Sequence, residues 1–374
     1  MVDVMLRCKK NERNHKILFI TCIAVFALLF IIHSAYMYKT VESMNTLHLA
    51  AFLIGVFVVQ MLFYTVTALG FLIFGKISGY EFRFMRIAFM KWQKNKEGKI
   101  KLTIINERGP SAVCSMTPPD MKDGKFPYLL YSHGLVILSS ICIVVSAVFF
   151  AFNFNTPVIS SLLLLFIFVL LTYVILDVFV GNSRLARDVK KSPEALKGIW
   201  LFLKCSDPEF SDTDSEGLPD EWFSSTCDAD TSIYWSCTYL IFAGGRHLIK
   251  KDFKKAAEVF DKILDPSANI TYTEYLYTVA DRLFCELMTE ANPEVIERLY
   301  TNEFKGFLNN VRTYTNLCRN YAFTLFIEKN PAGAAQIKSE FFEASKNPYN
   351  QKDAQAETEL LLYAENKYFS NSQP

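Results

Sequence analysis

The sequence predicts an α-helical integral membrane protein with four transmembrane helices, a small membrane-associated β-sheet and an all-α C-terminal cytosolic domain. Four apolar stretches are long enough to cross the hydrocarbon core of a bilayer, which requires about 20 helical residues. They cover Ile17–Met37, Leu47–Phe74, Leu129–Phe154 and Val158–Val180. Alternating polar and apolar residues separate the second stretch from the third, and helical periodicity dominates after the fourth.

The N-terminal region, residues 1–16, is basic and precedes the first apolar stretch. That stretch is longer than the apolar region of a secretion signal, which has about 7–15 residues, and no small-x-small cleavage site follows it. We therefore interpret it as a retained membrane anchor, the first helix of a transmembrane core that covers residues 17–183.

The charges that flank the apolar stretches predict their orientation. Lysine and arginine are concentrated before the first stretch, between the second and the third, and after the fourth. The connections Lys39–Asn45 and Asn153–Pro157 carry few charges or none. Because basic flanks remain in the cytoplasm, the sequence predicts a multi-pass protein of the cell membrane, with the lipid bilayer as a partner and both termini in the cytoplasm.

The insertion at residues 80–128 has the pattern of half-buried strands. Glu81–Arg86 and Lys99–Ile104 alternate polar and apolar residues, and Asn95–Gly98 is typical of a turn. We expect a small antiparallel sheet at the cytoplasmic membrane face; the alternative is a basic loop lying on anionic lipid head groups. Basic and aromatic residues also occur together in nucleic-acid-binding proteins. Beside a membrane, contact with lipid is the favoured interpretation, so no nucleic-acid partner is expected.

Residues 184–221 predict a connecting helix and an acidic linker. Ser192 is a favourable capping residue, and Pro193 suits the first position of a helix. The acidic stretch Asp207–Gly217 does not place a glycine and a closing glutamate at the spacing of a calcium-binding loop. We therefore interpret it as a solvated linker.

Residues 222–374 predict a helical cytosolic domain. Apolar residues between Ile249 and Leu264 recur at steps of three and four, which places one apolar face toward a partner helix. The segment from Lys251 to Pro266 resembles the second helix of a tetratricopeptide repeat, although no second copy is found at the period of about 34 residues. Further helices are expected at Tyr272–Thr289, Pro293–Tyr300, Glu303–Glu328, Pro331–Ser345 and Asp353–Phe369.

Cysteine usage and missing motifs exclude several classes of protein. The nine cysteines are scattered and form no Cys-x-x-Cys pair, which argues against a disulfide framework and against a thiolate zinc site. Reduced thiols facing the cytosol are the expected state. The sequence also lacks a glycine-rich phosphate loop and a Gly-x-Ser-x-Gly nucleophile elbow.

Several segments, taken in order, resemble a known family. They are Val66–Gly75, Ser78–Tyr80, Pro118–Asp120, Asp123–Tyr131, Val180–Ser183, Pro193–Leu196 and Pro219–Phe223. Over Thr65–Phe223 the chain is similar to the site-2 proteases, a family of intramembrane zinc metalloproteases. It most resembles a group from Gram-positive bacteria that carries a helical cytosolic tail.

The resemblance implies a metal site whose ligands are missing. The family binds zinc through a His-Glu-x-x-His motif, which needs two histidines one helical turn apart and a glutamate that handles protons. Here Thr67 and Phe71 stand at the histidine positions, Ala68 at the glutamate position, and Asn182 in place of the third, carboxylate ligand. We therefore expect no catalytic residues, no metal and no cofactor, since without zinc no hydroxide nucleophile forms at neutral pH.

Three polar residues are candidates for lining the former zinc pocket. His133 is the one of the five histidines expected to approach it, and Ser139 stands roughly where the family carries an asparagine. Asp177 is an ionisable group in or at the edge of the membrane, which marks a functional position unless the carboxylate is interfacial or internally paired. One histidine and one aspartate fall short of the three protein ligands of catalytic zinc.

The expected function is binding rather than catalysis. The protein would be a catalytically inactive relative of the site-2 proteases that holds a membrane peptide or protein, as in peptide export or immunity, while its tail recruits a cytosolic protein. The alternative is an active intramembrane zinc metalloprotease whose ligands lie elsewhere. A transporter accessory subunit comes third, because the apolar stretches contain hardly any charge to form an ion path.

Overall fold

The computed structural model describes residues 16–25, 27–28, 31–32, 35, 46–95, 98–105, 111–179, 181–205, 219–223, 229–346 and 351–371. The chain divides into two compact units. Residues 11–187 form the first, here called the membrane unit, and the second contains residues 188–374, here called the helical unit. The expected acidic linker, Asp207–Gly217, lies outside the described residues.

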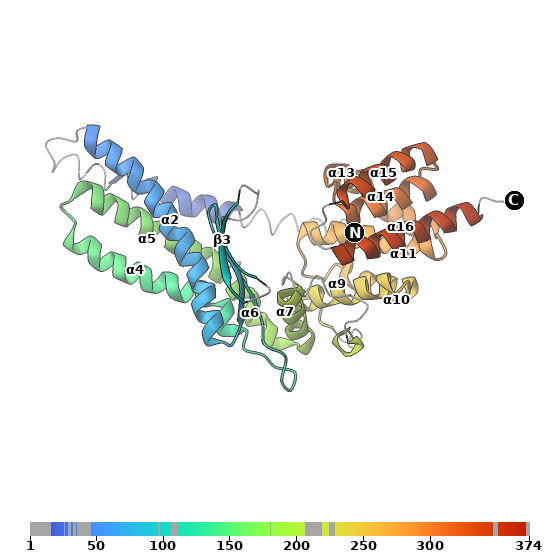
Figure 1. Ribbon diagram of the computed structural model, residues 1–374, viewed down its shortest axis with the longest axis horizontal. Coiled ribbons are helices and arrows are strands. Elements are labelled where there is room, and N and C mark those ends of the chain that lie inside the picture. The colour runs from blue at the N-terminus through green and yellow to red at the C-terminus, as the bar shows by residue number, and fades with distance from the viewer. Residues whose placement is uncertain are drawn as a thin grey trace. The chain divides into compact units, whose positions relative to one another are not determined.

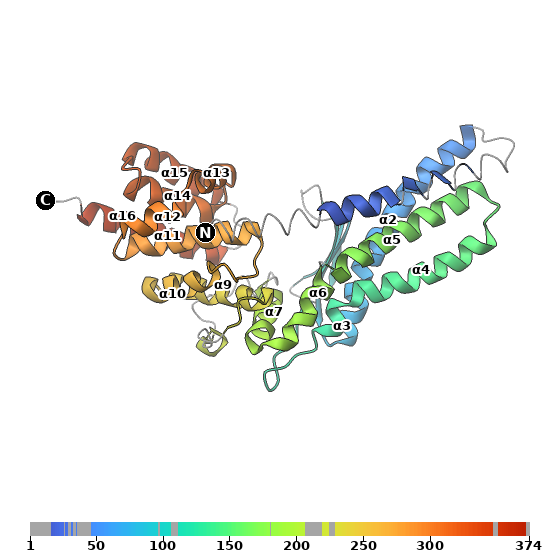
Figure 2. The same ribbon diagram turned by 180° about the vertical axis from the view of Figure 1, so that it is seen from behind.

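Within its described residues, the membrane unit contains three helices that are long and apolar enough to cross a bilayer. They are α2 (Thr46–Ile77), α4 (Gly134–Phe152) and α5 (Pro157–Phe179), and both views show them running alongside one another (Figure 1, Figure 2). These helices correspond to the second, third and fourth predicted spans. The first predicted span, Ile17–Met37, falls partly outside the described residues, within which Lys16–Val25 is a shorter apolar helix. The expectation of four spans stays a prediction.

Small side chains allow the three long helices to pack closely. A Cβ added to Gly55 of α2 would lie 2.2 Å from a side-chain carbon of Leu162 of α5, so the glycine makes room for the leucine side chain between the two helices. Ser139 and Ser146 on α4, and Ser160 and Ser161 on α5, are buried. Close approach through small residues is the usual way in which helices associate inside a membrane. The outward surfaces carry large exposed apolar side chains, as lipid contact requires.

The predicted sheet is present and has four antiparallel strands in the order β3-β2-β1-β4. The strands are β1 (Glu81–Ile87), β2 (Met90–Lys94), β3 (Ile100–Ile104) and β4 (Ala112–Thr117). β1 pairs with β2 through Met85 and Trp92, and with β4 through Met85 and Cys114. The alternation in β1 and β3 predicted those strands, whereas β2 and β4 were not expected. The alternative of a basic loop is therefore wrong.

The expected third span is interrupted near its start. The short helix α3 (Leu129–Ser132) precedes α4, and His133 separates the two with backbone angles of −92° and 0°. α5 is followed by the short helix α6 (Asn182–Asp188). Both α2 and the sheet pack against this part of the unit, since α2 contacts β1, β4 and α3.

The helical unit confirms the helical character of the C-terminal region. Its α-helices are α7 (Pro193–Cys205), α9 (Tyr234–Ile249), α10 (Phe253–Ile263), α11 (Tyr272–Met288), α12 (Pro293–Leu299), α13 (Asn302–Asn310), α14 (Tyr314–Phe326), α15 (Pro331–Ala344) and α16 (Gln351–Asn371). The expected single helix over Glu303–Glu328 is wrong, because α13 and α14 are separate. Val311 is extended, and the Thr313 hydroxyl accepts a hydrogen bond from the backbone N–H of Asn316, which starts a new helix.

The helices of this unit pack in succession. α9 contacts α7 and α10, α10 contacts α11, and α14 contacts α11, α15 and α16. A buried ion cluster joins three of them: Arg319 of α14 donates to Asp281 of α11 at 2.8 Å and to Glu357 of α16 at 2.6 and 3.0 Å. Arg319 is 1% exposed. Its charge is therefore stabilised by the two carboxylates and not by water.

Candidate functional site

The three motif positions on α2 are occupied by side chains that serve packing. The Thr67 hydroxyl donates to the carbonyl oxygen of Phe63 at 2.9 Å, one turn back in the same helix. Ala68 is fully buried. Phe71 is half-buried, and its ring centroid lies 5.5 Å from that of Tyr131 in α3. A bonded hydroxyl, a methyl group and a phenyl ring provide neither zinc ligands nor a proton acceptor.

The helix that carries these positions crosses α4 at two glycines. A Cβ added to Gly134 would lie 2.6 Å from the carbonyl oxygen of Gly70 and 3.0 Å from Cβ of Phe74. In the reverse direction, a Cβ on Gly70 would lie 2.9 Å from Cα of Leu135. Since real Cβ atoms almost never approach this closely, the crossing requires glycine on both sides. The contact brings the start of α4 beside the last two turns of α2.

An aromatic cluster closes the end of α2 that faces the sheet. The rings of Tyr80 and Tyr131 stack with centroids 4.3 Å apart, and Phe71 contacts Tyr131. Gly75 lets Met116 of β4 approach, because a Cβ there would lie 2.3 Å from the methionine sulfur. The Tyr80 hydroxyl is buried without a hydrogen-bond partner among the described residues. Burial raises the pKa of Tyr80, and Tyr131 raises it further, so the phenol is a donor at neutral pH.

Asp177 lies at the same level of the bundle as Thr67. The rings of Phe63 in α2 and Tyr173 in α5 are 5.0 Å apart, and the Gly55–Leu162 contact shows that these helices run parallel. Thr67 follows Phe63 by four residues, as Asp177 follows Tyr173, which is about one helical turn in each case. Asp177 is 8% exposed, and a Cβ on Gly181 would lie 2.6 Å from its Oδ1.

Ser139 reaches this level from the third helix. It follows Gly134 by five residues on α4, which runs opposite to α2, so it returns to the level of Thr67. Ser139 is fully buried, and its hydroxyl has no hydrogen-bond partner among the described residues. The buried hydroxyl of Thr172 on α5 likewise has none in the described part of the chain. Thr67, Ser139, Thr172 and Asp177 are called the polar seam below.

The other two predicted residues are His133 and Asn182. His133 is half-buried between α3 and α4, and its Nδ1 is 2.8 Å from the carbonyl oxygen of Leu129, which fixes the ring on its own helix. Asn182 is the first residue of α6, but its side chain lies outside the described residues. The helix contacts therefore put Thr67, Ser139 and Asp177 at a similar level along the bundle, and the ring of His133 is held by the carbonyl oxygen of Leu129.

The described residues include no group of three or more histidine, cysteine, aspartate or glutamate side chains that could hold a metal ion. Within the polar seam, Asp177 is the one side chain of a type that commonly binds zinc. The sequence did not predict the roles of Tyr80, Tyr131 and Thr172. Tyr80 and Tyr131 belong to the segments that resemble the site-2 proteases, whereas nothing in the sequence distinguished Thr172.

Comparisons of this chain with protein-family models, with curated proteins and with solved structures found no match.

Proposed function

We propose that this chain is a membrane-embedded binding protein, a catalytically inactive relative of the site-2 proteases that holds a membrane peptide or protein beside α2. The observation that carries the proposal is the packing at the motif positions. The Thr67 hydroxyl is bonded to its own helix, Ala68 is buried, and Phe71 packs on Tyr131. These side chains supply no zinc ligand and no proton acceptor, so the proposal assigns this part of α2 to binding and not to catalysis.

The polar seam supports binding because it holds donors that the chain itself does not use. Buried hydroxyls inside a membrane helix usually bond a carbonyl oxygen of the preceding turn. Ser139 and Thr172 do not, among the described residues, and an unsatisfied hydroxyl in such an environment is costly. Because both hydroxyls are buried, α4 or α5 would have to shift before the carbonyl oxygens of a partner helix or an extended peptide could satisfy them. Asp177 adds the one carboxylate of the seam.

The location proposed for this activity is the cell membrane, with four spans and with both termini in the cytoplasm. The basic flanks support that orientation through the positive-inside rule. The bilayer is itself a partner of the sheet: the edge strand β3 exposes Ile100, Leu102 and Ile104 by 63, 52 and 80%. An apolar edge of this kind would be a liability in water, and lipid would cover it.

We further propose that the helical unit is a tetratricopeptide-like array that recruits a cytosolic protein. α9, α11, α14 and α16 begin at residues 234, 272, 314 and 351, which is an interval of roughly 40 residues, within the range of helical repeats. Stacked helix pairs of this kind build extended binding surfaces. By analogy with the family, the whole protein would assist peptide export or immunity to a membrane-active peptide in Gram-positive bacteria.

Photo-cross-linking in intact cells tests the proposal. Replacing Phe71 by a photo-reactive benzoyl-phenylalanine should give a discrete cross-linked partner whose mass does not change with time after capture. The matched control is the same replacement at Phe57, which is 59% exposed on the outer side of α2 and should meet lipid. The same adducts from both positions, or a partner that is cut during capture, would contradict the proposal.

An active zinc metalloprotease with ligands elsewhere is the alternative, and chelator-sensitive cleavage of a transmembrane peptide would favour it. A third hypothesis is that the protein is a transporter accessory subunit. A stable complex with a pump subunit would favour that one.

A further inference from the structure

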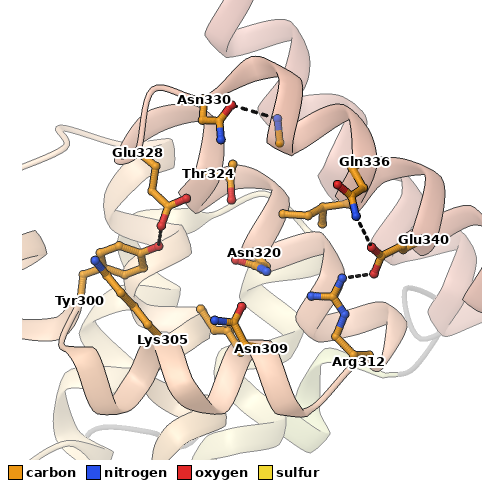
Figure 3. Close-up of a pocket in the computed structure, with 13 residues that line it drawn as sticks. Tyr300, Lys305, Asn309, Arg312, Asn320, Thr324, Glu328, Asn330, Gln336 and Glu340 are labelled. Atoms are coloured by element: carbon orange, nitrogen blue, oxygen red, sulfur yellow. Dashed lines mark hydrogen bonds and ion pairs between the residues drawn. The ribbon is translucent and has the colours of Figure 1, made fainter.

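A polar pocket in the helical unit lies between α13, α14 and α15 (Figure 3). Its volume is about 280 Å³, close to the lower end of the range for small-ligand sites. Asn320 and Thr324 of α14 point into its centre, between Tyr300 and Lys305 on one side and Arg312 on the other. The pocket is separate from the polar seam, and it is lined mainly by polar groups.

The acidic groups of the pocket are already engaged. Glu340 of α15 accepts hydrogen bonds from Arg312 and, at 3.3 Å, from Gln336. Glu328 accepts one from the Tyr300 hydroxyl at 2.9 Å. Burial raises the pKa of Tyr300, and the hydrogen bond to Glu328 raises it further, so the phenol remains a donor. The two carboxylates are therefore held by the protein itself.

Three other groups have no such engagement. The Lys305 ammonium lies 4.5 Å from the centre of the Tyr300 ring and forms no ion pair with any described acidic residue. Asn320 is 7% exposed, yet its amide makes no hydrogen bond within the described part of the chain and points into the cavity. Asn309, at the rim, makes none with the residues described here. One cation without an ion-pair partner and two amides without hydrogen-bond partners among the described residues therefore face the same space.

We propose that this pocket binds a peptide carboxylate. A carboxylate only accepts hydrogen bonds, so the Lys305 ammonium and the amide N–H groups of Asn309 and Asn320 match it, and the amide oxygens match an adjacent peptide N–H. A doubly charged phosphate fits less well, because Glu328 and Glu340 would repel it more strongly than a single charge. The inference rests on the proposed recruitment of a cytosolic protein by the helical unit, and it names the chemistry recognised.

The test measures fluorescence anisotropy with the full-length protein in detergent micelles. Three fluorescein-labelled pools of random pentapeptides serve as probes. The first lacks acidic side chains and ends in a free carboxylate, the second is the same pool with an amidated end, and the third is amidated but carries one fixed glutamate. Saturable binding of the first pool identifies a chain terminus as the source of the carboxylate, and binding of the third identifies an acidic side chain. Either result supports the proposal if the second pool does not bind.

Variants assign the binding to this pocket. Lys305→Met and Asn320→Leu should each weaken binding about tenfold or more, because each removes a direct hydrogen bond to a charged group. Lys197→Met is the matched control, since Lys197 is a half-buried lysine that lies 5.8 Å from the Tyr239 ring, far from the pocket lining. It should bind like the unsubstituted protein. Thermal unfolding of each variant shows whether the fold is retained; Asn320→Leu should not lower the melting temperature.

Two results would overturn the inference. One is equal binding of the amidated pool, or no binding of any pool up to about 1 mM. The other is unchanged affinity in folded Lys305→Met and Asn320→Leu. Because cross-linking at Phe71 reports on the membrane unit, the failure of peptide binding and the failure of the proposed membrane function are read independently.

Discussion

Replacing Gly134 by alanine tests the helix crossing on which the candidate site depends. The added Cβ would lie 2.6 Å from the carbonyl oxygen of Gly70 and 3.0 Å from Cβ of Phe74. Because the first contact is with backbone, it cannot be relieved by rotation of a side chain, and α4 must move away from α2. Overpacking of this kind costs about 1–3 kcal/mol. The higher helix propensity of alanine returns at most about 1 kcal/mol. We expect a net loss of up to about 2 kcal/mol.

The assay is reversible unfolding of the full-length protein in mixed micelles, followed by tyrosine and tryptophan fluorescence. Two controls separate the crossing from general effects. Val144→Ala changes a side chain on α4 that is 64% exposed and should shift the free energy of unfolding by less than about 0.5 kcal/mol. Gly245→Ala adds a Cβ that meets nothing within 4 Å, so it should be neutral or stabilising. Stability of Gly134→Ala equal to or above that of the unsubstituted protein would refute the reasoning.

Two further predictions concern the helical unit. Arg319→Met leaves Asp281 and the buried Glu357 without their cation, so it should destabilise the unit by about 3–5 kcal/mol in denaturant titration; a loss below about 1 kcal/mol would show that the ion cluster is dispensable. The second is a pH dependence. Burial alone would raise the pKa of Glu365, but the hydrogen bonds from Lys338 at 2.7 and 2.8 Å outweigh it, and the pKa is lowered overall. Because folding lowers the pKa of the Glu365 carboxyl, its ionisation stabilises the folded protein at pH values above the usual range of glutamate pKa values. This stabilisation is lost as the pH falls through the pKa of Glu365 in the folded state. The melting temperature should therefore fall less between pH 6 and about pH 3 in Glu365→Gln than in the unsubstituted protein, and parallel curves would contradict the assignment.

The sequence anticipates the parts of the fold that depend on local pattern. The apolar stretches gave α2, α4 and α5 to within a few residues, and the alternation in Glu81–Arg86 gave β1. The sequence does not predict the elements whose conformation depends on tertiary contacts. Ala112–Thr117 becomes a strand because it pairs with β1, and its own pattern does not alternate. Met90–Gln93 does alternate, but the segment is too short to predict a strand without its pairing with β1 and β3. The break before Tyr314 depends on a threonine cap within a stretch whose apolar spacing continues through it.

The arrangement of the candidate site could also be predicted only where it depends on local sequence pattern. The positions of Thr67 and Phe71 on one helix follow from spacing alone. The level of Ser139 and Asp177 relative to them depends on how three helices cross, and the crossing of α2 and α4 depends on Gly70 and Gly134, which are far apart in the sequence. The stacking of aromatic rings at the end of α2 has the same origin. Contacts between residues far apart in the sequence produce no periodic pattern, so they cannot be predicted from the sequence alone.

The zinc content of the purified protein tests the central claim most directly. Elemental analysis of the full-length chain should find well below one zinc per chain, because Thr67, Ala68, Phe71 and Asn182 supply no ligand set. The four-fold variant Thr67→His, Ala68→Glu, Phe71→His and Asn182→Asp should bind close to one, since the proposed relationship keeps the positions and loses only the side chains. One tightly held zinc in the unsubstituted protein, with cleavage of a transmembrane peptide that a chelator abolishes, would contradict the account.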